Sequence, residues 1–520
     1  MSSAAATGAT GTVGAIELGV VVAYMAGLLL LGVVASRRVK DARDYFAANK
    51  QLGFWATAFS ARATGESAWL LLGLTGMGAA VGLHAMWAVF GEALGVWLAW
   101  AWLAKPFKRL TDRYDAITIP DYLEARFRDG TQRLRLLAAA VLVVFITIYV
   151  SAQIDATGTA FESFLGWRYE VGAVVGFLVV LVYVTTGGFL AVAWSDVVQG
   201  ALMVTGLVVL PLVGVVVAGG PGVVVDKLGA IDPGLLSLGK SGWSLEVVLS
   251  AIGLSMIGAG FLGSPQIFVR FLAIRGESEL RPGMRVAVVW TLLADGGAVL
   301  TGMIGRALLT GAGDDLTAVL GKGGQDVLPA MVAALFPALI VGLYIAIVLS
   351  AIMSTVDSLL VLAASALARD VWQQVRHPEL PDAALTGLSR KVTVALAAVA
   401  LAVSLGVAAM MPGRTVFWFV IFGWSGIAAT FCPTMILSLV WKGFTARGAM
   451  AAMLVGFATV PLCRFVLMDV PALAALLEPL SELPPAFVLS MLAGVVVSRL
   501  DPAQAALAAD VAGELDEAAR

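Results

Sequence analysis

The stretch Ala58-Phe-Ser-Ala-Arg-Ala-Thr-Gly-Glu-Ser-Ala-Trp-Leu-Leu-Leu-Gly-Leu-Thr-Gly76 places polar groups in the middle of a long apolar segment. Its centre, Arg62 to Ser67, contains a guanidinium, a carboxylate, two hydroxyls and a glycine. A charge at the centre of a membrane helix costs about 2.5–3.5 kcal/mol on insertion scales. Gly65 is a place where such a helix can unwind, and unwound backbone at membrane depth is tolerated only in a cavity or inside protein. The stretch therefore predicts a binding site in a broken helix. The alternative is a kinked helix in which Arg62 and Glu66, one turn apart, only pair with each other.

The composition places this segment in a polytopic membrane protein. The chain has 520 residues, of which 60% are hydrophobic and 13% charged, whereas soluble domains carry about 25% charged residues. The net charge of −2 gives no basic field that would attract nucleic acid. Cys432 and Cys463 lie in apolar runs and are interpreted as core residues. The two histidines, His84 and His377, are isolated, which argues against a histidine metal site.

Apolar runs of about 20 residues predict an all-α protein with about thirteen transmembrane helices. Their expected positions are 15–36, 54–80, 84–104, 134–164, 170–186, 195–218, 245–271, 286–311, 337–368, 390–411, 415–441, 446–467 and 482–499.

Basic residues predict how these spans are oriented. They gather in the connections after the first, third, seventh and ninth spans, while the even-numbered connections hold few. Because cytoplasmic loops are enriched in Lys and Arg, we expect the N-terminus outside and the C-terminus in the cytoplasm of a multi-pass cell-membrane protein. The tail 501–520 is acidic and rich in alanine, and is expected to be a short helix or disordered. The basic residues that set the orientation are Arg37, Arg38, Lys40, Arg43, Lys105, Lys108, Arg109, Arg113, Arg126, Arg128, Arg133, Arg135, Arg275, Arg281, Arg285, Arg369, Arg376, Arg390 and Lys391.

A second interrupted segment, Gly253-Leu-Ser-Met-Ile-Gly-Ala-Gly-Phe-Leu-Gly-Ser-Pro-Gln266, lies five spans after the first. Its glycines and proline cannot form a good continuous helix. Two broken helices at matching places in two halves indicate an inverted repeat with the binding site between the halves. We therefore expect one five-helix repeat over 54–218 and a second, inverted one over 245–441. The segments 1–53 and 446–500 would be peripheral.

The ninth span offers oxygen ligands on one face. Ala351, Ser354 and Thr355 are three and four residues apart, so they share a side of the helix. Hydroxyl and carbonyl oxygens suit a small hard cation. The alternative is that both hydroxyls bond back to carbonyls of their own helix, which is frequent in membrane helices.

Together, motifs spread from about residue 40 to 470 resemble the sodium:solute symporter family, most closely its sodium/proline symporter branch. The most specific run is Gly187-Gly-Phe-Leu-Ala-Val-Ala-Trp-Ser-Asp-Val-Val-Gln199. The other carrying residues are Ala58 to Gly76, Ile117-Thr-Ile-Pro-Asp-Tyr122 with Arg126 and Phe127, Thr147-Ile-Tyr149, Gly263-Ser-Pro265, Met353-Ser-Thr355, and Trp424-Ser-Gly426 followed by Pro433.

The resemblance implies thirteen helices, a five-plus-five inverted-repeat (LeuT-like) core and alternating access. It also implies a sodium site between the first broken helix and the ninth span, without catalytic residues or a cofactor. Carried over by position, the sodium ligands would be the carbonyls of Ala63, Glu66 and Ala351 and the hydroxyls of Ser354 and Thr355. The substrate would lie near Ser67, Ala68, Trp69, Tyr149, Phe261 and Pro265.

Several residues depart from the resembled branch. That branch has aspartate where this chain has Gly65, methionine for Glu66 and glycine for Arg62. Ile257 and Phe261 stand where it has tryptophan and tyrosine, so the shape of the pocket is expected to differ. The intramembrane charges Glu92, Asp155, Asp295 and Arg306 have no role implied by the family, and we expect them to pair inside the bundle. Asp196 is interpreted as a helix cap.

These observations predict a sodium-coupled symporter of a small organic solute, an amino acid similar to proline or a related carboxylate. One alternative is a proton-coupled carrier that uses Glu66 or Asp155, because a carboxylate in apolar surroundings can hold a proton near neutral pH. Another is a membrane sensor with a transporter fold, although no soluble domain follows Asp501. The chain has no phosphate-binding loop ending in Gly-Lys-Ser/Thr, so an ion gradient is expected to supply the energy. The expected partners are the solute, sodium and the lipid bilayer.

Overall fold

The computed structural model of the chain describes residues 14–37 and 47–520. Within these residues, eleven helices are long and apolar enough to cross a membrane. One of them, Phe54–Arg113, covers the second and third predicted spans, and the fifth predicted span begins with the shorter apolar helix Tyr169–Val179. An all-helical, multi-pass membrane protein is therefore confirmed. The basic residues Arg38, Lys40 and Arg43 lie outside the described residues.

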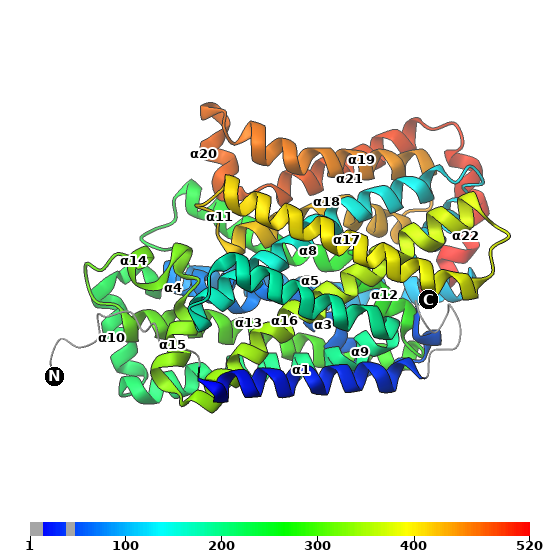
Figure 1. Cartoon of the computed structure of the whole chain (residues 1–520). Helices are drawn as coiled ribbons and strands as arrows, with labels where there is room; N and C mark the ends of the chain where they lie inside the picture. Colours follow the sequence, from blue (N-terminus) through cyan, green and yellow to red (C-terminus); the bar gives the residue numbers. More distant parts are fainter. Residues whose placement is uncertain (1–13, 38–46) are drawn as a thin grey trace.

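The long helices run roughly side by side through the molecule (Figure 1). The helices that make up the spans, some of them short pieces of one span, are α1 Ala15–Ser36, α3 Phe54–Ala68, α4 Thr75–Val81, α5 Met86–Leu98, α6 Ala104–Arg113, α8 Arg133–Leu165, α9 Tyr169–Ala218, α11 Leu245–Met256, α12 Pro265–Ala273, α13 Leu280–Leu309, α16 Ala338–Ser365, α17 Asp382–Met410, α18 Val416–Val440, α19 Ala446–Leu462 and α21 Leu483–Leu500. They follow the predicted spans, except that α9 continues through the fifth and sixth predicted spans with a break at Gly188.

Shorter helices connect the long ones at the two ends of the bundle. At the end shown on the left of Figure 1, α10, α14, α15 and α20 close the connections. At the opposite end lie α12, the C-terminus and α22. The bounds of the short helices are α7 Ile119–Phe127, α10 Pro221–Ile231, α14 Leu316–Leu320, α15 Val327–Leu335, α20 Pro471–Leu480 and α22 Gln504–Ala519.

Helices α3, α16 and α18 form the interior of the bundle. From Tyr344 to Ser365 every residue of α16 is buried, and so is every residue of α18 from Phe419 to Leu439. By contrast, α1 and α17 expose much of their apolar surface. A helix that is apolar all round belongs in the interior or against lipid, and both situations occur here. Polar groups on α3 and α16 are consequently sealed from solvent.

Both predicted helix breaks are confirmed. In the first, Ser67 has φ 58° and ψ −166°, a conformation that costs free energy for a residue with a Cβ. The expectation that Gly65 unwinds is wrong, because Gly65 stays helical and the break lies two residues later. The absent side chain of Gly65 instead admits the ring of Phe261, which a Cβ would meet at 2.6 Å.

The second break separates α11 from α12. After α11 the chain tightens into a 3-10 segment, η6 (Ile257–Leu262), and leaves helical geometry at Gly263. Pro265 then begins α12, a position where its missing N–H leaves no bond unmade. The backbones of η6 and α5 are nearly in contact, because a Cβ on Gly258 would lie 1.9 Å from the carbonyl oxygen of Gly91. The second break is therefore held tightly against α5.

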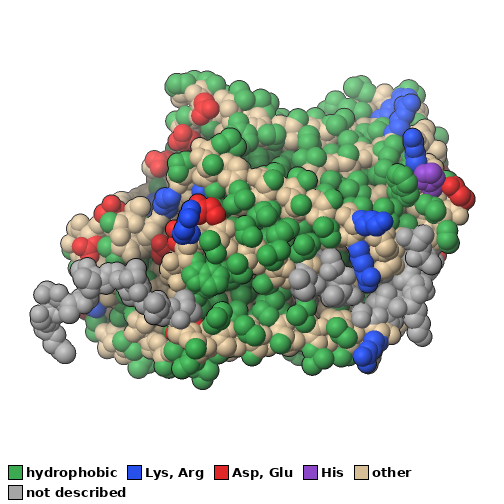
Figure 2. Space-filling model, viewed as in Figure 1, with side chains coloured by type: hydrophobic (Ala, Val, Ile, Leu, Met, Phe, Trp, Pro, Cys, Tyr) green, Lys and Arg blue, Asp and Glu red, His purple; other side chains and the backbone are tan. Residues whose placement is uncertain are grey.

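Charged side chains are segregated between the two ends. On the face shown in Figure 2, hydrophobic side chains cover the middle, and most Lys and Arg side chains lie at the end that carries α22. The acidic tail forms a helix, as one of the two expectations had it. Arg113 pairs with Glu517 at 2.8 Å, and Arg128 pairs with Glu514 at 2.9 Å. The tail and the basic connection after the third predicted span are thus on the same side of the bundle.

Candidate functional site

The hydroxyl face of α16 meets the broken helix α3. Ser354 Oγ donates to the carbonyl of Ala63 at 3.0 Å, and Thr355 Oγ1 donates to the carbonyl of Thr64 at 3.1 Å. Both hydroxyls also lie near the carbonyl of Ala351, at 3.1 and 3.2 Å. All five residues are buried. Each hydroxyl lies near a carbonyl of its own helix, α16, and near a carbonyl of α3. The bonding within the helix and the gathering of oxygens that suits a cation therefore occur together.

The structure thus brings together four of the five residues predicted as sodium ligands: Ala63, Ala351, Ser354 and Thr355. Glu66 belongs to the same helix, but its carboxylate lies on the other side, against Arg62. Whether the Glu66 carbonyl ligates sodium stays a prediction. The carbonyl of Thr64 was not among the predicted ligands, although Thr64 follows Ala63 directly and precedes the break.

A buried arginine of α12 contacts three other helices, namely α3, α9 and α16. Arg270, on α12, contacts Asp196 of α9 at 3.2 Å, Thr64 of α3 at 2.7 Å and Ser60 of α3 at 3.0 Å. It also donates to Ser358 of α16. Asp196 therefore pairs with a cation, and its interpretation as a helix cap is wrong. The spacing of Ser60 and Thr64 by one turn could have indicated a polar face, but no sequence signal links it to Arg270.

Aromatic rings converge beside the two breaks. Phe261 and Trp424 have ring centroids 5.1 Å apart, and Tyr149 lies 6.4 Å from Trp424. The indole of Trp424 donates to the carbonyl of Ile257 at 2.9 Å, which fixes α18 to the second break. Trp424 therefore lies against two of the predicted substrate residues, Tyr149 and Phe261. Trp424 belongs to one of the motifs that carry the family resemblance. Pro265 lies four residues beyond Phe261, at the start of α12.

The other predicted substrate residues surround the first break. Ser67 adopts the non-helical conformation, and Ala68 donates its N–H to Gln153 Oε1 of α8 at 3.0 Å. The ring of Trp69 packs edge-on against the ring of Phe417, with ring centroids 6.1 Å apart. Gln153 lies one turn from Tyr149, and its buried Nε2 has no hydrogen-bond partner. Gln153 was not among the predicted substrate residues, although its spacing from Tyr149 places both on one face of α8.

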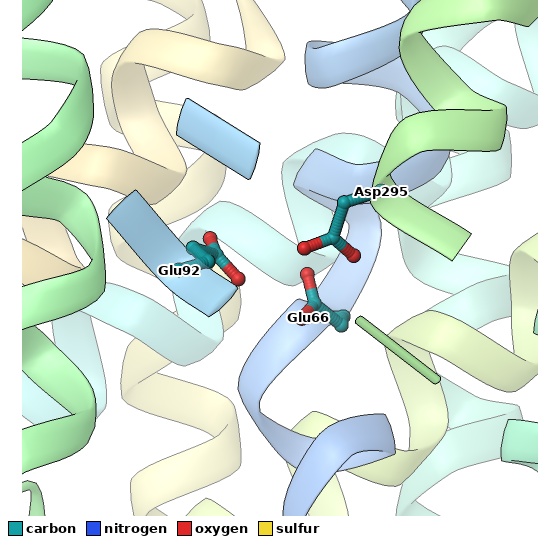
Figure 3. Close-up of side chains that lie close together, drawn as sticks. All are labelled: Glu66, Glu92 and Asp295. Atoms are coloured by element: carbon teal, nitrogen blue, oxygen red, sulfur yellow. The ribbon is translucent and has the colours of Figure 1, made fainter. Parts of the chain in front are cut away.

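Arg62 and Glu66 form the predicted pair, and two more carboxylates join it. Arg62 Nη2 lies 3.1 Å from Glu92 Oε2 and 3.6 Å from Asp295 Oδ2. Figure 3 shows the carboxylates of Glu66, Glu92 and Asp295 directed toward one another from α3, α5 and α13. All four side chains are at most 1% exposed. We call these four residues the carboxylate cluster.

Asp155 lies elsewhere. It pairs with Arg414 and accepts a hydrogen bond from Tyr169 at 2.6 Å. These three residues line a cavity of about 450 Å³ at the end of α8, together with Lys322 and Gln325. The expected pairing of Asp155 is confirmed, and its partner Arg414 lies in the connection between α17 and α18. Arg306 is also outside the cluster, and its Nη1 lies 3.4 Å from the carbonyl of Ala79.

Comparisons with known proteins place this arrangement in context. The sequence model of the sodium:solute symporter family matches residues 45–456. The chain is 37% identical to the high-affinity proline transporter PutP of Bacillus subtilis (strain 168), over 92% of this chain and 96% of that protein. It is 31% identical to the sodium/proline symporter of Escherichia coli (strain K12), covering 84% and 85%. A solved structure of a Na+-coupled sialic acid symporter matches with a TM-score of 0.73 at 19% identity, covering 94% of this chain and 98% of that one. At that identity the likeness concerns the fold.

Proposed function

Because this chain belongs to the sodium:solute symporter family, we propose that it carries proline or a closely related amino acid across the membrane together with sodium. The observation that carries the proposal is the meeting of Ser354 and Thr355 with the carbonyls of Ala63 and Thr64 beside the helix break. Both of these relatives are named for proline transport, and each is matched over most of its length.

Sodium would lie between α3 and α16. In the structure the two hydroxyls donate to carbonyls, so their lone pairs are free to turn toward a cation. Oxygen–oxygen distances of 3.0–3.2 Å among these groups are short enough for several of them to contact one ion. We assign the ligands to the carbonyls of Ala63, Glu66 and Ala351 and to the hydroxyls of Ser354 and Thr355, with the Thr64 carbonyl close by.

The solute would lie beside the sodium site, between the two breaks. An amino acid such as proline has a carboxylate that needs hydrogen-bond donors and an apolar ring that needs an apolar surface to pack against. The unpartnered Nε2 of Gln153 can donate to the carboxylate. The side chains of Tyr149, Phe261 and Trp424 form the apolar surface. Ser67, Ala68, Trp69 and Pro265 complete the assigned pocket through the backbone of the two breaks. Buried polar groups of this kind discriminate strongly against ligands that leave them unpaired.

The two breaks also support the proposed architecture. We assign inverted five-helix repeats to 54–218 and 245–441 within thirteen spans, with 1–53, 446–500 and the tail 501–520 at the periphery. Broken helices that present backbone groups to substrate and ion are the typical device of alternating-access carriers. The proposed orientation has the N-terminus outside and the C-terminus in the cytoplasm. The contact of α22 with the basic connection supports it, because it places two predicted cytoplasmic segments on one side.

The test is transport by the purified protein in proteoliposomes. We expect labelled proline to accumulate when sodium is high outside, and not when choline replaces sodium or when the sodium gradient is collapsed. Unlabelled competitors should include proline analogues, acyclic amino acids and carboxylates without an amine. Uptake driven equally well without sodium would contradict the coupling. Competition by every carboxylate, with or without an amine, would contradict an amino-acid substrate.

A further inference from the structure

An apolar groove runs along α1 at the edge of the bundle. Helix α1 packs against α9 and α16 (Figure 1), and a cavity of about 490 Å³ lies between these helices and the end of α8. On α1 the groove is lined by Glu17, Val21, Met25 and Leu29, which are four residues apart and therefore form one stripe of the helix. Volumes of about 300–1,000 Å³ are typical of small-ligand sites, so the groove is large enough for a bound molecule.

The groove opens on the outside of the bundle. Leu18 and Val22 of α1 and Leu178 of α9 line it, and their exposed fractions are 46%, 59% and 51%. The opposite wall includes Phe161 of α8 and Ile345 of α16, which are buried. Because α1 is apolar and long enough to cross a membrane, the exposed rim on α1 faces lipid acyl chains.

The length of the groove matches one leaflet of a bilayer. From Glu17 to Leu29 the helix α1 rises about 18 Å, at about 1.5 Å per residue. One leaflet contributes about 15 Å of hydrocarbon, half of the total thickness of about 30 Å. Glu17 lies in the first turn of α1, at the end of the span where lipid headgroups are found. Trp167, in the connection between α8 and α9, also lines the groove, and tryptophan is enriched at membrane interfaces. One acyl chain therefore fits lengthwise, with its headgroup beside Glu17.

Glu17 indicates the kind of headgroup. It is the one charged residue among the described residues that line the groove, and its buried Oε2 has no hydrogen-bond partner in residues 14–37 and 47–520. A buried polar atom without a partner is unfavourable, and an ionised carboxylate can only accept hydrogen bonds. The matching group is therefore a cationic donor. A primary ammonium offers three N–H donors, a choline headgroup offers none, and a phosphatidylglycerol headgroup is anionic and repelled by Glu17.

Two other occupants fit the groove less well than a lipid. An ordered water needs two to four polar partners, whereas the described lining offers only two polar side chains, Glu17 and Trp167. The segment 1–13 of the chain contains only two large apolar side chains, Met1 and Val13, which are too few to fill a groove of this length. A lipid with an ammonium headgroup supplies both the long apolar chain and the cation.

We propose that the groove binds one lipid of the phosphatidylethanolamine class, whose acyl chain lies between α1, α9 and α16 and whose primary ammonium binds Glu17. Ile345 and Leu349 of α16 line the groove, and Leu349 precedes the predicted sodium ligand Ala351 by two residues. The bound chain thus packs against the helix that carries the hydroxyls of the proposed sodium site. The lipid site itself depends only on α1 spanning the membrane, and the proposed orientation assigns it to the outer leaflet.

The test is the lipid that the purified protein retains. The protein in detergent is mixed with equal parts of phosphatidylethanolamine, phosphatidylcholine and phosphatidylglycerol and purified again, and the extracted lipids are quantified by mass spectrometry. We expect phosphatidylethanolamine to be retained about tenfold more than either other lipid, because its ammonium forms a charge-assisted hydrogen bond with Glu17. Glu17→Gln should lose this preference. The control Glu246→Gln, an exposed carboxylate in the first turn of α11, should keep it.

A second variant tests the acyl chain separately. Met25→Trp places an indole in the groove and should reduce the retained lipid of every class, whereas Leu30→Trp, on the exposed side of α1, should not. Equal retention of the three lipids by the wild type would overturn the proposal, and so would an unchanged preference in Glu17→Gln. A lipid-free dimer whose second copy covers the groove would also overturn it. The wild-type comparison needs no variant to fold, and none of these measurements depends on transport.

Discussion

Replacing Arg62 with glutamine should be far more damaging than replacing Glu66 with glutamine. Arg62 is the cation for three buried carboxylates, at 3.1 Å from Glu92 and 3.6 Å from Asp295 and in contact with Glu66. With an effective dielectric constant of about 20, each of these two separations corresponds to roughly 5 kcal/mol of attraction before desolvation is subtracted. Removing one partner of a buried pair typically costs about 3–5 kcal/mol, and Arg62→Gln should fall at the upper end.

Glu66→Gln acts in the opposite sense on the charge balance. It removes one attraction to Arg62 but also removes repulsion from Glu92 and Asp295, and it leaves Arg62 with two ionisable partners. We expect a loss below about 1 kcal/mol, because no charge is left without a counter-charge. The double variant Arg62→Gln/Glu66→Gln should resemble Arg62→Gln, since two carboxylates still lack a cation.

The assay is a titration of purified protein with sodium dodecyl sulfate in mixed micelles, followed by circular dichroism. A loss of 3 kcal/mol changes the folded-to-unfolded ratio by more than about a hundredfold, which shifts the midpoint clearly. The matched control is Arg168→Gln, which replaces an exposed arginine. A variant such as Gln153→Glu is not suitable as a control, because it changes the assigned solute site. Equal losses of unfolding free energy for Arg62→Gln and Glu66→Gln would refute the reasoning, because they would mean that Glu66 is the only carboxylate that Arg62 stabilises.

Three further predictions concern packing, the tail and topology. Gly258→Ala would place a Cβ 1.9 Å from the backbone of α5 and should reduce the folded yield through a loss of at least about 1–3 kcal/mol, whereas Gly19→Ala, with open space around it, should not. Burial raises the pKa of Glu514, but hydrogen bonds from Tyr114 and Arg128 outweigh it and hold the pKa below its ordinary value of 4.5. Its stabilising contribution, about 0.2–1 kcal/mol per exposed pair, is therefore present at neutral pH and is lost as the pH falls below that value. The protection of the α22 amides against hydrogen exchange, taken relative to the intrinsic rate at each pH, should accordingly decrease in acid and in Glu514→Gln, and unchanged protection in both would contradict the docking. A cysteine at Gly130 should react with an impermeant reagent only from the cytoplasm and one at Ser241 only from outside; reaction from the same side would overturn the orientation.

The sequence was sufficient for features that depend on local composition. Glycine and proline content predicted the second break, and helical spacing placed Ala351, Ser354 and Thr355 on one face. Where the first helix breaks was not predictable in the same way. Gly65 is the residue that most easily leaves the helix, yet Ser67 does so, because the N–H of Ala68 bonds to Gln153 of another helix. A tertiary contact overrides the local preference.

Contacts between distant segments explain the other differences. Arg62 and Glu66 were predictable as a pair because they are one turn apart. Nothing in the sequence indicates that Glu92 and Asp295 join them, since this depends on how α5 and α13 are rotated about their axes. The same holds for Arg270 and Asp196, and for Asp155 and Arg414. The sequence shows that an intramembrane charge needs a partner, but only the packed bundle identifies the partner.

The most direct test of the sodium site is the sodium concentration that gives half-maximal proline uptake by proteoliposomes, measured for Ser354→Ala/Thr355→Ala. Each lost hydroxyl should cost about 1–3 kcal/mol, so the two together should raise that concentration at least about tenfold. Ser365→Ala is the control, because this buried hydroxyl on the same helix bonds to the carbonyl of Leu362. We expect a steep increase for the double variant and none for Ser365→Ala. An unchanged sodium requirement in a double variant that still transports proline would contradict a sodium site between α3 and α16.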